Sequence, residues 1–309
     1  MNNILQHLQS PVVRSNLSIT GKIKAAARNF LNRNGFEEYD TPILMTKTGE
    51  KYNSTFDIMI DDKPASLADS PQIFKLMLTM AGYEKYYQYA HCFRPIALES
   101  ETHTRLCEFT QIDIEMQAET LSVLTRFAEA LIVEICIAVN RKPRIEHMEG
   151  IYCRNTYGSN MKPDLRKTDD EISVVFIEHM PLTNGDRTKI QTLIPCHHIF
   201  ALPSNEIQST TEDTLTNTQT ESFDIVINGI EIGGGDLRIL NRDLLQQMMD
   251  IFDVDQGEYT EYLEMLSNYT GKQSGGFAIG LERLVMALSG CDDIRSTVCF
   301  PDYYKRSEH

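Results

Sequence analysis

The pair Asn228-Gly229 constrains the fold of this chain more than any other feature, because it joins two runs in which apolar residues alternate with others, 223–227 and 230–232. Asn-Gly between such runs is a strong signal for a two-residue β-hairpin. The return run leads into Gly233-Gly234-Gly235, and three consecutive glycines lose chain entropy on folding without adding side-chain packing. We therefore predict an antiparallel hairpin in which a β-bulge forms or another group approaches the glycine backbone closely.

A second strand is predicted over 108–115, and its two faces differ in character. Side chains alternate across a strand, so Gln111, Asp113 and Glu115 share one face while isoleucines occupy the other. The polar face either meets solvent, as antiparallel sheets often allow, or forms the floor of a polar pocket. From this strand alone the solvent-facing interpretation is favoured. Further strands are predicted over 87–93 and 274–280.

Helical patterns lie between these strands. Apolar residues of 22–34 share one helical face, and Gly35 supplies a stop signal. Ser70-Pro71 is typical of a helix start, and Gly82 marks the end of that helix. Its inward side chains are expected to be Ile73, Phe74, Met77 and Met80. Strands joined by hairpins, with helices between them, indicate an α+β fold, an antiparallel sheet with helices packed on it.

Composition narrows the function classes. The 309 residues include 29 Lys and Arg against 44 Asp and Glu, a net charge of −15. That charge argues against a non-specific nucleic-acid surface or an anionic-membrane surface, although it leaves room for a small basic pocket that binds ATP. We find no secretory signal and no apolar stretch long enough for a membrane span. The scattered cysteines show no metal-binding spacing and are expected to be buried thiols, so a cytoplasmic location is expected.

Two polar segments interrupt the pattern. Residues 204–221 are rich in Thr and lack apolar periodicity, so we expect a mobile surface loop there. Residues 152–170 are also polar and irregular, and the sequence does not assign them to a helix or a strand.

Charged residues at the strand ends indicate possible ligands. The chain has no Walker loop and no Gly-x-Gly-x-x-Gly after an early strand. Phosphates can instead be held by arginine forks, for which Arg94 and Arg283 are candidates at strand ends. Asp224 and Glu231 flank the hairpin turn and are suited to a cation such as Mg²⁺. Taken singly, each of these side chains is as well explained by a surface ion pair or by solvation.

Taken together and in order, these features resemble the catalytic core of the class II aminoacyl-tRNA synthetases, most closely the aspartyl branch of the Asp/Asn/Lys subgroup. Residues 35–42 are similar to the first motif of that family, a helix and strand at the dimer interface. Phe93-Arg94 with 108–113 resembles the second motif, and 275–283 resembles the third. The resemblance extends roughly from Leu17 to Pro301.

The resemblance implies a six- or seven-stranded antiparallel sheet flanked by helices, one catalytic domain over 1–309, and a homodimer. It also implies that the N-terminal anticodon-binding barrel of the aspartyl enzymes is missing, so we expect no stable tRNA binding. The implied cofactors are ATP and Mg²⁺, with Asp224 and Glu231 as metal ligands.

For ATP, the resemblance makes Arg94 the clamp on the α-phosphate and the activated carboxylate, and Arg283 the clamp on the γ-phosphate; these are the two expected catalytic residues. Ile96 stands where the family usually has an acidic residue that contacts adenine, and Glu99 or Glu101 is a possible substitute. The expected ATP-binding set is Arg94, Glu99, Glu101, Phe109, Glu231, Gly280 and Arg283.

For the amino acid, the resemblance implies that Gln72 and Asp113 bind the α-amino group, while Lys75 and Arg238 face the side-chain carboxylate of L-aspartate. Glu50 is expected on a flexible loop over the amino group. The expected set is Glu50, Ser70, Gln72, Lys75, Asp113, His197, His198, Gly235 and Arg238. The alternatives are that Lys75 is an ordinary solvated lysine and that the two histidines form a surface or core pair. Asp236 departs from the family, where a small hydroxyl residue is usual.

The resulting hypothesis is an AMP-forming ligase that activates L-aspartate with ATP and passes the aspartyl group to ammonia or another small amine. Its nearest precedents are the stand-alone paralogues that make asparagine, although that product requires activation of the side-chain carboxylate rather than the α-carboxylate. One alternative is transfer to a tRNA, a carrier protein or a natural-product amine. Another is a non-catalytic regulatory paralogue that binds an amino acid or adenylate, which Ile96 favours.

Overall fold

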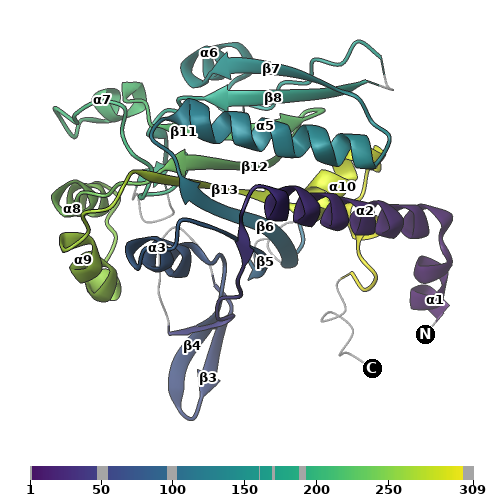
Figure 1. Cartoon of the computed structure of the whole chain (residues 1–309), viewed down its shortest axis with the longest axis horizontal. Helices are drawn as coiled ribbons and strands as arrows, with labels where there is room; N and C mark the ends of the chain where they lie inside the picture. The colour runs from purple at the N-terminus through teal and green to yellow at the C-terminus, as the bar shows by residue number, and fades with distance from the viewer. Residues whose placement is uncertain are drawn as a thin grey trace.

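The computed structural model describes residues 2–46, 55–95, 103–159, 161–168, 171–187 and 193–301. Within them, eight strands form one sheet in the order β1-β5-β6-β13-β12-β11-β8-β7 (Figure 1). The strands from β5 to β8 in that order are antiparallel, whereas β1 and β7 pair in parallel with their neighbours at the two edges. In sheet order the strands are Glu37–Glu38, Lys85–Phe93, Glu108–Gln117, Ser274–Gly280, Ile230–Leu237, Ser222–Ile227, Ile172–Glu178 and Pro143–Glu149.

One face of this sheet is covered by three helices, and the main hydrophobic core lies between them and the strands (Figure 1). The helices are α2 (Pro11–Arg33), α5 (Leu121–Ala138) and α10 (Leu281–Ser289). The isoleucines of β6, Ile112 and Ile114, are buried in that core. Because side chains alternate along a strand, Gln111, Asp113 and Glu115 point to the opposite face. The antiparallel α+β architecture is therefore confirmed, with two parallel edge pairs that the sequence did not indicate.

Smaller elements surround the sheet. A three-stranded sheet is made by β2, β4 and β3, and a two-stranded sheet by β9 and β10. A second core packs α3, α8 and α9 together beyond one end of the main sheet. The bounds are α1 Asn2–Gln9, β2 Leu44–Thr46, β3 Asp57–Ile60, β4 Lys63–Leu67, α3 Gln72–Met80, α6 Gly150–Tyr157, β9 Thr183–Arg187, β10 Leu193–Pro195, α7 Glu212–Asn217, α8 Arg242–Ile251, η1 Gln256–Tyr259, α9 Thr260–Ser267 and η2 Ile294–Thr297.

The predicted hairpin is confirmed, and both explanations of its glycines hold. Asn228 and Gly229 have φ of 52° and 78°, the left-handed values of a tight hairpin turn. The register shifts between Ile225 and Val226, which marks a bulge. A Cβ on Gly234 would lie 2.6 Å from Asp224 Oδ1 and 2.9 Å from His197 Nε2, so this glycine gives two polar side chains room beside the strand.

Two predicted helices differ in detail. The helix expected over 22–34 begins at Pro11, and the added turns bury Val13 and Asn16. The helix expected from Ser70-Pro71 begins at Gln72, with Pro71 as its N-cap. Its buried side chains are Lys75, Leu76 and Thr79, whereas the four apolar side chains that we expected to point inward are only partly buried.

Part of each polar segment is helical. Within 204–221 the structure contains α7, whose Leu215 is buried, and a bridge joins Pro203 to Thr220. A six-residue helix with one apolar anchor gives no periodicity, so the sequence pattern could not reveal it. The start of 152–170 belongs to α6.

In the described ranges we find no helix that combines the length and the apolar character needed to cross a bilayer.

Candidate active site

Two adjoining cavities open on the polar face of the central strands. The first, of about 280 Å³, contains Lys75 and is called the Lys75 cavity here. The second, of about 250 Å³, contains Arg283 and is called the Arg283 cavity. Both are lined by Arg94, Gln111, Glu231 and Gly233, so a ligand in one can reach a ligand in the other.

The Lys75 cavity gathers every described residue that the sequence predicted for the amino acid. These residues come from α3 and the segment just before it, from β6, from the segment after β10, and from β12 and the residue that follows it. They are Ser70, Gln72, Lys75, Asp113, His197, His198, Gly235 and Arg238. Glu50, together with Ile96, Glu99 and Glu101 from the ATP predictions, lies outside the described residues.

Lys75 is a buried, paired cation. Its side chain is 5% exposed, and its ammonium lies 2.9 Å from Asp113 Oδ1 and 3.1 Å from Glu115 Oε1. Both carboxylates are as deeply buried as the lysine. The solvated-lysine alternative is therefore wrong, and so is the solvent-facing interpretation of the polar face of β6. Burial raises the pKa of Asp113 although Lys75 opposes the shift.

Arg238 is the second buried cation, and it shares Glu115 with Lys75. Its Nη1 donates to Asp236 Oδ1 at 2.7 Å, its Nε donates to Glu115 Oε2 at 3.4 Å, and its Nη2 donates to Glu115 Oε1. The sequence marked Glu115 as one of a polar row but gave it no role. In the structure it links the two cations that we expected to face the substrate.

The two histidines pair with each other, with ring centroids 5.3 Å apart, and both contact Asp236, so the paired-histidine alternative is compatible with the structure and both side chains also line the cavity. His198 Nε2 lies 2.9 Å from Asp236 Oδ2, and His197 Nδ1 lies 3.5 Å from the same oxygen. His197 Nε2 is also 3.2 Å from Asp224 Oδ1. Burial alone lowers the pKa of His197, but Asp224 and Asp236 together raise it to about 10. Burial likewise lowers the pKa of His198, which stays lowered although Asp236 opposes it.

Two buried polar atoms on the wall of the Lys75 cavity, Gln72 Nε2 and His198 Nδ1, have no hydrogen-bond partner within the described ranges. A third, Asp236 Oδ2, has ion-pair contacts with the two histidines but no well-oriented hydrogen bond there. Unmet donors and acceptors cost free energy unless a ligand or water satisfies them. Their convergence on one cavity is typical of a binding site for a small polar molecule.

The Arg283 cavity is rich in arginine. Arg94 lies over the ring of Phe109, 5.3 Å from guanidinium carbon to ring centroid. Arg283 donates from Nη1 to the Glu231 carbonyl at 3.2 Å and from Nε to the Thr104 carbonyl at 3.3 Å. Burial lowers the pKa of Arg283. Arg105 also lines this cavity, although nothing in its sequence pattern had singled it out. Three guanidinium groups in one cavity suit a polyphosphate.

Glu282 fixes helix α10 against strand β6. Both of its carboxylate oxygens accept a hydrogen bond from the Thr110 amide, at 3.0 and 3.1 Å. This contact ties the first turn of α10 to β6 and thereby positions Arg283, which lines the same cavity as Arg94. Sequence reasoning missed Glu282 because its partner is a backbone group 172 residues away.

Asp224 and Glu231 meet the requirements of the predicted Mg²⁺ site in part. Both carboxylates line the Lys75 cavity, and Glu231 also lines the Arg283 cavity. Oxygen donors suit Mg²⁺, which usually keeps waters and phosphate oxygens as its remaining ligands. Each carboxylate already has a cationic neighbour, since Asp224 contacts His197 and Glu231 lies 3.7 Å from Arg283. The donor set fits a shared Mg²⁺–phosphate site rather than an ion held by protein alone.

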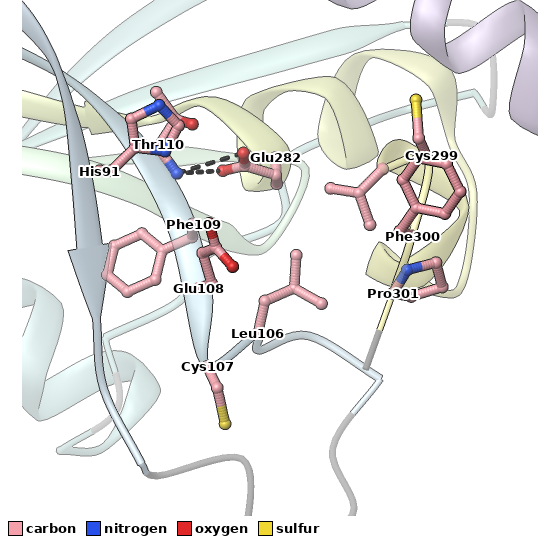
Figure 2. Close-up of a pocket in the computed structure, with 11 residues that line it drawn as sticks. His91, Leu106, Cys107, Glu108, Phe109, Thr110, Glu282, Cys299, Phe300 and Pro301 are labelled. Carbon is pink, nitrogen blue, oxygen red and sulfur yellow. Dashed lines mark hydrogen bonds between the residues drawn. The ribbon is translucent and has the colours of Figure 1, made fainter. Parts of the chain in front are cut away.

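A third cavity, of about 870 Å³, lies between the start of β6 and the C-terminal segment 298–301 (Figure 2). Figure 2 shows the Thr110–Glu282 contact at its upper wall. Its lining is mainly apolar with two carboxylates, Glu108 and Glu282, so it does not match a phosphate ligand despite its size. The charges place the nucleotide candidate in the smaller Arg283 cavity.

Comparisons with known proteins bear on the family and the fold of this chain. The family model described as tRNA synthetases class II (D, K and N) matches residues 1–303. Aspartate–tRNA(Asp/Asn) ligase of Thermoanaerobacter pseudethanolicus is 25% identical, with 95% of this chain and 72% of that protein covered. The Bacillus subtilis protein of the same name is 24% identical over the same shares.

Solved structures share the fold. Asparaginyl-tRNA synthetase from Pyrococcus horikoshii, complexed with asparaginyl-adenylate, aligns with a TM-score of 0.75 at 21% identity, covering 97% of this chain and 70% of that one. Entamoeba histolytica asparaginyl-tRNA synthetase aligns with a TM-score of 0.74 at 22% identity, covering 100% and 71%.

Proposed function

The chain belongs to the class II tRNA synthetases of the D, K and N group, and we propose that it uses ATP to activate a four-carbon amino acid as its adenylate, with L-aspartate and L-asparagine as the candidates. The observation that carries this proposal is the junction of the two cavities at Arg94 and Gln111. An arginine-rich nucleotide site and a charged amino-acid site must share a wall for one substrate to react with the other.

In the proposed reaction, the carboxylate oxygen of the amino acid attacks the α-phosphorus of ATP, a new P–O bond forms, and the bond to pyrophosphate breaks. Arg94 lines both cavities, so it is placed to contact the attacking carboxylate and the α-phosphate together. Arg283 and Arg105 neutralise charge on the leaving pyrophosphate. These groups act by electrostatics and positioning, and the protein supplies no nucleophile.

Asp224 and Glu231 are the proposed ligands of Mg²⁺, which when bound supplies positive charge against the phosphate oxygens. Their positions support this role, because Glu231 stands in the wall that the two cavities share. His197 Nε2 lies 3.2 Å from Asp224 Oδ1 and so helps to keep that oxygen in place.

Three features support an amino acid of the aspartate type. Gln72 Nε2 is an unpaired donor in the cavity wall, and Asp113 is a carboxylate for the α-ammonium group. Lys75 and Arg238 lie at the side-chain end. The two relatives described above, each aligned with 95% of the chain, are aspartate–tRNA(Asp/Asn) ligases. L-Asparagine is a second candidate, because both cations at the side-chain end already have carboxylate partners.

The proposed acceptor is ammonia or another small amine. A net charge of −15 repels a nucleic-acid backbone, which weighs against stable tRNA binding. Transfer to a tRNA or a carrier protein is the alternative within the same chemistry. The non-catalytic alternative is a regulatory protein that binds the amino acid or adenylate without turning it over.

The test is amino-acid-dependent exchange of pyrophosphate into ATP, without added tRNA, with L-aspartate and L-asparagine as substrates. We expect exchange with at least one of them, and its absence with all amino acids would refute adenylation. Mass spectrometry of products after adding ammonia, or tRNA, then identifies the acceptor. A new amide supports the amine acceptor, and an aminoacyl-tRNA band supports the alternative.

The chain is also proposed to form a homodimer through the region of α1, α2 and the segment before β2. Each of these three segments exposes a large apolar side chain, with Leu5 56%, Val12 53% and Ile43 41% exposed. Exposed apolar groups of this size favour burial against another surface. Light scattering of the purified chain should give twice the monomer mass, and a monomer at micromolar concentration would contradict the assignment.

A further inference from the structure

At the end of the Lys75 cavity proposed to bind the substrate side chain, both cations already have carboxylate partners from the protein itself. Arg238 carries five N–H donors, and four of them have acceptors in the protein. Two go to Glu115, one goes to Asp236, and one faces His198 Nε2 at 3.3 Å. A ligand carboxylate could therefore receive only one N–H from this arginine, whereas strong recognition of a carboxylate by arginine uses two parallel ones.

Among the contacts of the described residues, Lys75, like Arg238, has only one N–H donor free for a ligand. Two of its three donors face Asp113 and Glu115, at 2.9 and 3.1 Å, which leaves one N–H for a ligand. The two cations that the sequence assigned to the substrate carboxylate thus keep one donor each. Each N–H can bind a neutral oxygen acceptor as well as a charged one.

The balance of charges in the cavity also disfavours a ligand with a negatively charged side chain. Lys75 and Arg238 face three buried carboxylates, those of Asp113, Glu115 and Asp236. His197 and Asp224 contact each other and are left out of this count, so three carboxylates face two cations. At the shared wall, Arg94 and Glu231 cancel. Burial raises the pKa of Asp113, and a proton on that group brings the sum only to zero.

Asp236 is the carboxylate that occupies the Arg238 donor which a substrate carboxylate would otherwise bind. It stands two residues before Arg238, and because side chains repeat every two residues along extended chain, both point to the cavity. Its carboxyl is 0% exposed. Arg238 donates to one oxygen, and both histidines lie close to the other without a well-oriented hydrogen bond. Arg238 Nη1, which would otherwise meet an incoming carboxylate, is engaged by a carboxylate of the chain itself.

From this geometry we infer that Asp236 is a specificity-determining residue that selects, within the proposed adenylation reaction, a substrate with a neutral side-chain amide over one with a side-chain carboxylate. An amide oxygen accepts the remaining N–H of Lys75 or Arg238, and its NH₂ group donates to Asp236 Oδ2, which lacks a well-oriented donor among the described residues. A carboxylate has no proton for Asp236 and adds a further negative charge in a buried site. L-Asparagine is the expected substrate of this class.

The experiment compares kcat/KM for L-asparagine and L-aspartate in pyrophosphate exchange by the full chain. We expect the wild-type protein to favour asparagine by roughly tenfold or more, since sites with buried polar partners discriminate strongly against ligands that leave them unmatched. Asp236→Asn removes the charge at nearly constant shape, and Asp236→Ser also opens space beside Arg238. Both should move the ratio toward aspartate by roughly tenfold.

Asp243→Asn is the matched control, since it removes an exposed carboxylate in the first turn of α8 and should leave the ratio unchanged. A wild-type preference for aspartate, or for the cationic analogue L-2,4-diaminobutyrate, overturns the inference without any variant. It is also overturned if the folded Asp236 variants keep the wild-type ratio. If no amino acid supports exchange, the proposed function fails. Calorimetric titration of both amino acids then tests the inference by itself. Tighter binding of asparagine upholds the selectivity of the cavity, and equal or tighter binding of aspartate overturns it.

Discussion

Arg238 and Asp236 form an ion pair within one extended stretch of chain, with 2.7 Å between Nη1 and Oδ1 and neither side chain more than 1% exposed. Arg238 holds the pKa of Asp236 well below its usual range, although burial alone would raise it. The same arginine joins Glu115 on β6, so one guanidinium connects two strands across β13. This buried ion pair fixes the positions of the charged side chains in the site. Because each charge needs the other, removing either residue alone should lower the stability of the fold.

Removing the arginine alone should therefore destabilise the protein strongly. Arg238→Met leaves Asp236 and Glu115 buried without their main counter-charge, and the free energy of unfolding should fall by about 3–5 kcal/mol. Urea unfolding at neutral pH measures the loss. The double variant Arg238→Met/Asp236→Leu replaces both charges with apolar groups and should recover part of that stability. A single variant within about 0.5 kcal/mol of wild type would contradict the buried-pair account.

Lys75 should act on the amino acid and not on the nucleotide. Lys75→Leu removes one of the two N–H donors left for the ligand, and it leaves Asp113 and Glu115 without their lysine. We expect kcat/KM for the amino acid to fall by roughly a hundredfold while the KM for ATP changes by less than about threefold. Pyrophosphate exchange with each substrate varied in turn separates the two effects. Equal losses for both substrates would show that the variant disturbs the whole site.

The sequence predicted the site better than it predicted the contacts inside it. Period-two alternation placed Gln111, Asp113 and Glu115 on one face of a strand, and the structure confirms that placement. It could not show that Lys75, 38 residues earlier, meets Asp113, because such a contact depends on how α3 packs against the sheet. Lys75 was therefore expected to reach a ligand, whereas the protein itself supplies two of its partners.

Missed features have a common physical cause. Glu282 and Arg105 act through backbone groups or through a cavity wall formed by distant segments, and neither leaves a periodic signal. The short helix α7 depends on one buried leucine, and α2 continues toward its N-terminus through residues whose pattern is weak. Local patterns indicate which face of an element is buried, but they do not indicate what packs against it.

Arg283 should matter for the nucleotide more than for the fold. Within the described part of the chain its side chain contacts two carbonyl groups and Glu231, all near the cavity surface. Arg283→Ala should therefore lower pyrophosphate exchange by roughly a hundredfold or more, while the unfolding free energy changes by about 1 kcal/mol or less. Arg126→Ala, on the exposed face of α5, is the control and should preserve exchange. A large loss of stability in the first variant would mark Arg283 as structural.

His197 should make stability fall as the solution becomes alkaline. Its pKa is raised from 6.5 to about 10 by Asp224 and Asp236, so the folded chain holds a proton that the unfolded chain releases. The stabilisation is complete below the unfolded pKa and disappears as pH rises through the folded pKa, at about 1.4 kcal/mol for each unit of difference. Between about pH 7 and pH 9, wild type should lose more unfolding free energy than His197→Gln. Parallel urea curves for the two proteins would exclude a protonated His197.

Gly276 should be intolerant of even one added methyl group, because the side chain that links the two buried cations lies directly against it. A Cβ at this position would lie 2.2 Å from Glu115 Oε1 and 2.5 Å from the Ile114 carbonyl. Gly276→Ala must push Glu115 away from Arg238 and Lys75, so exchange should be lost together with about 2 kcal/mol or more of unfolding free energy. Gly21→Ala is the matched control, since nothing lies within 4 Å of its Cβ position in α2 and alanine favours a helix there by about 0.5–1 kcal/mol. Both variants add one methyl group, and calorimetry should show a lower melting temperature for Gly276→Ala and a higher one for Gly21→Ala. Equal shifts would contradict the placement of Glu115 between the two buried cations.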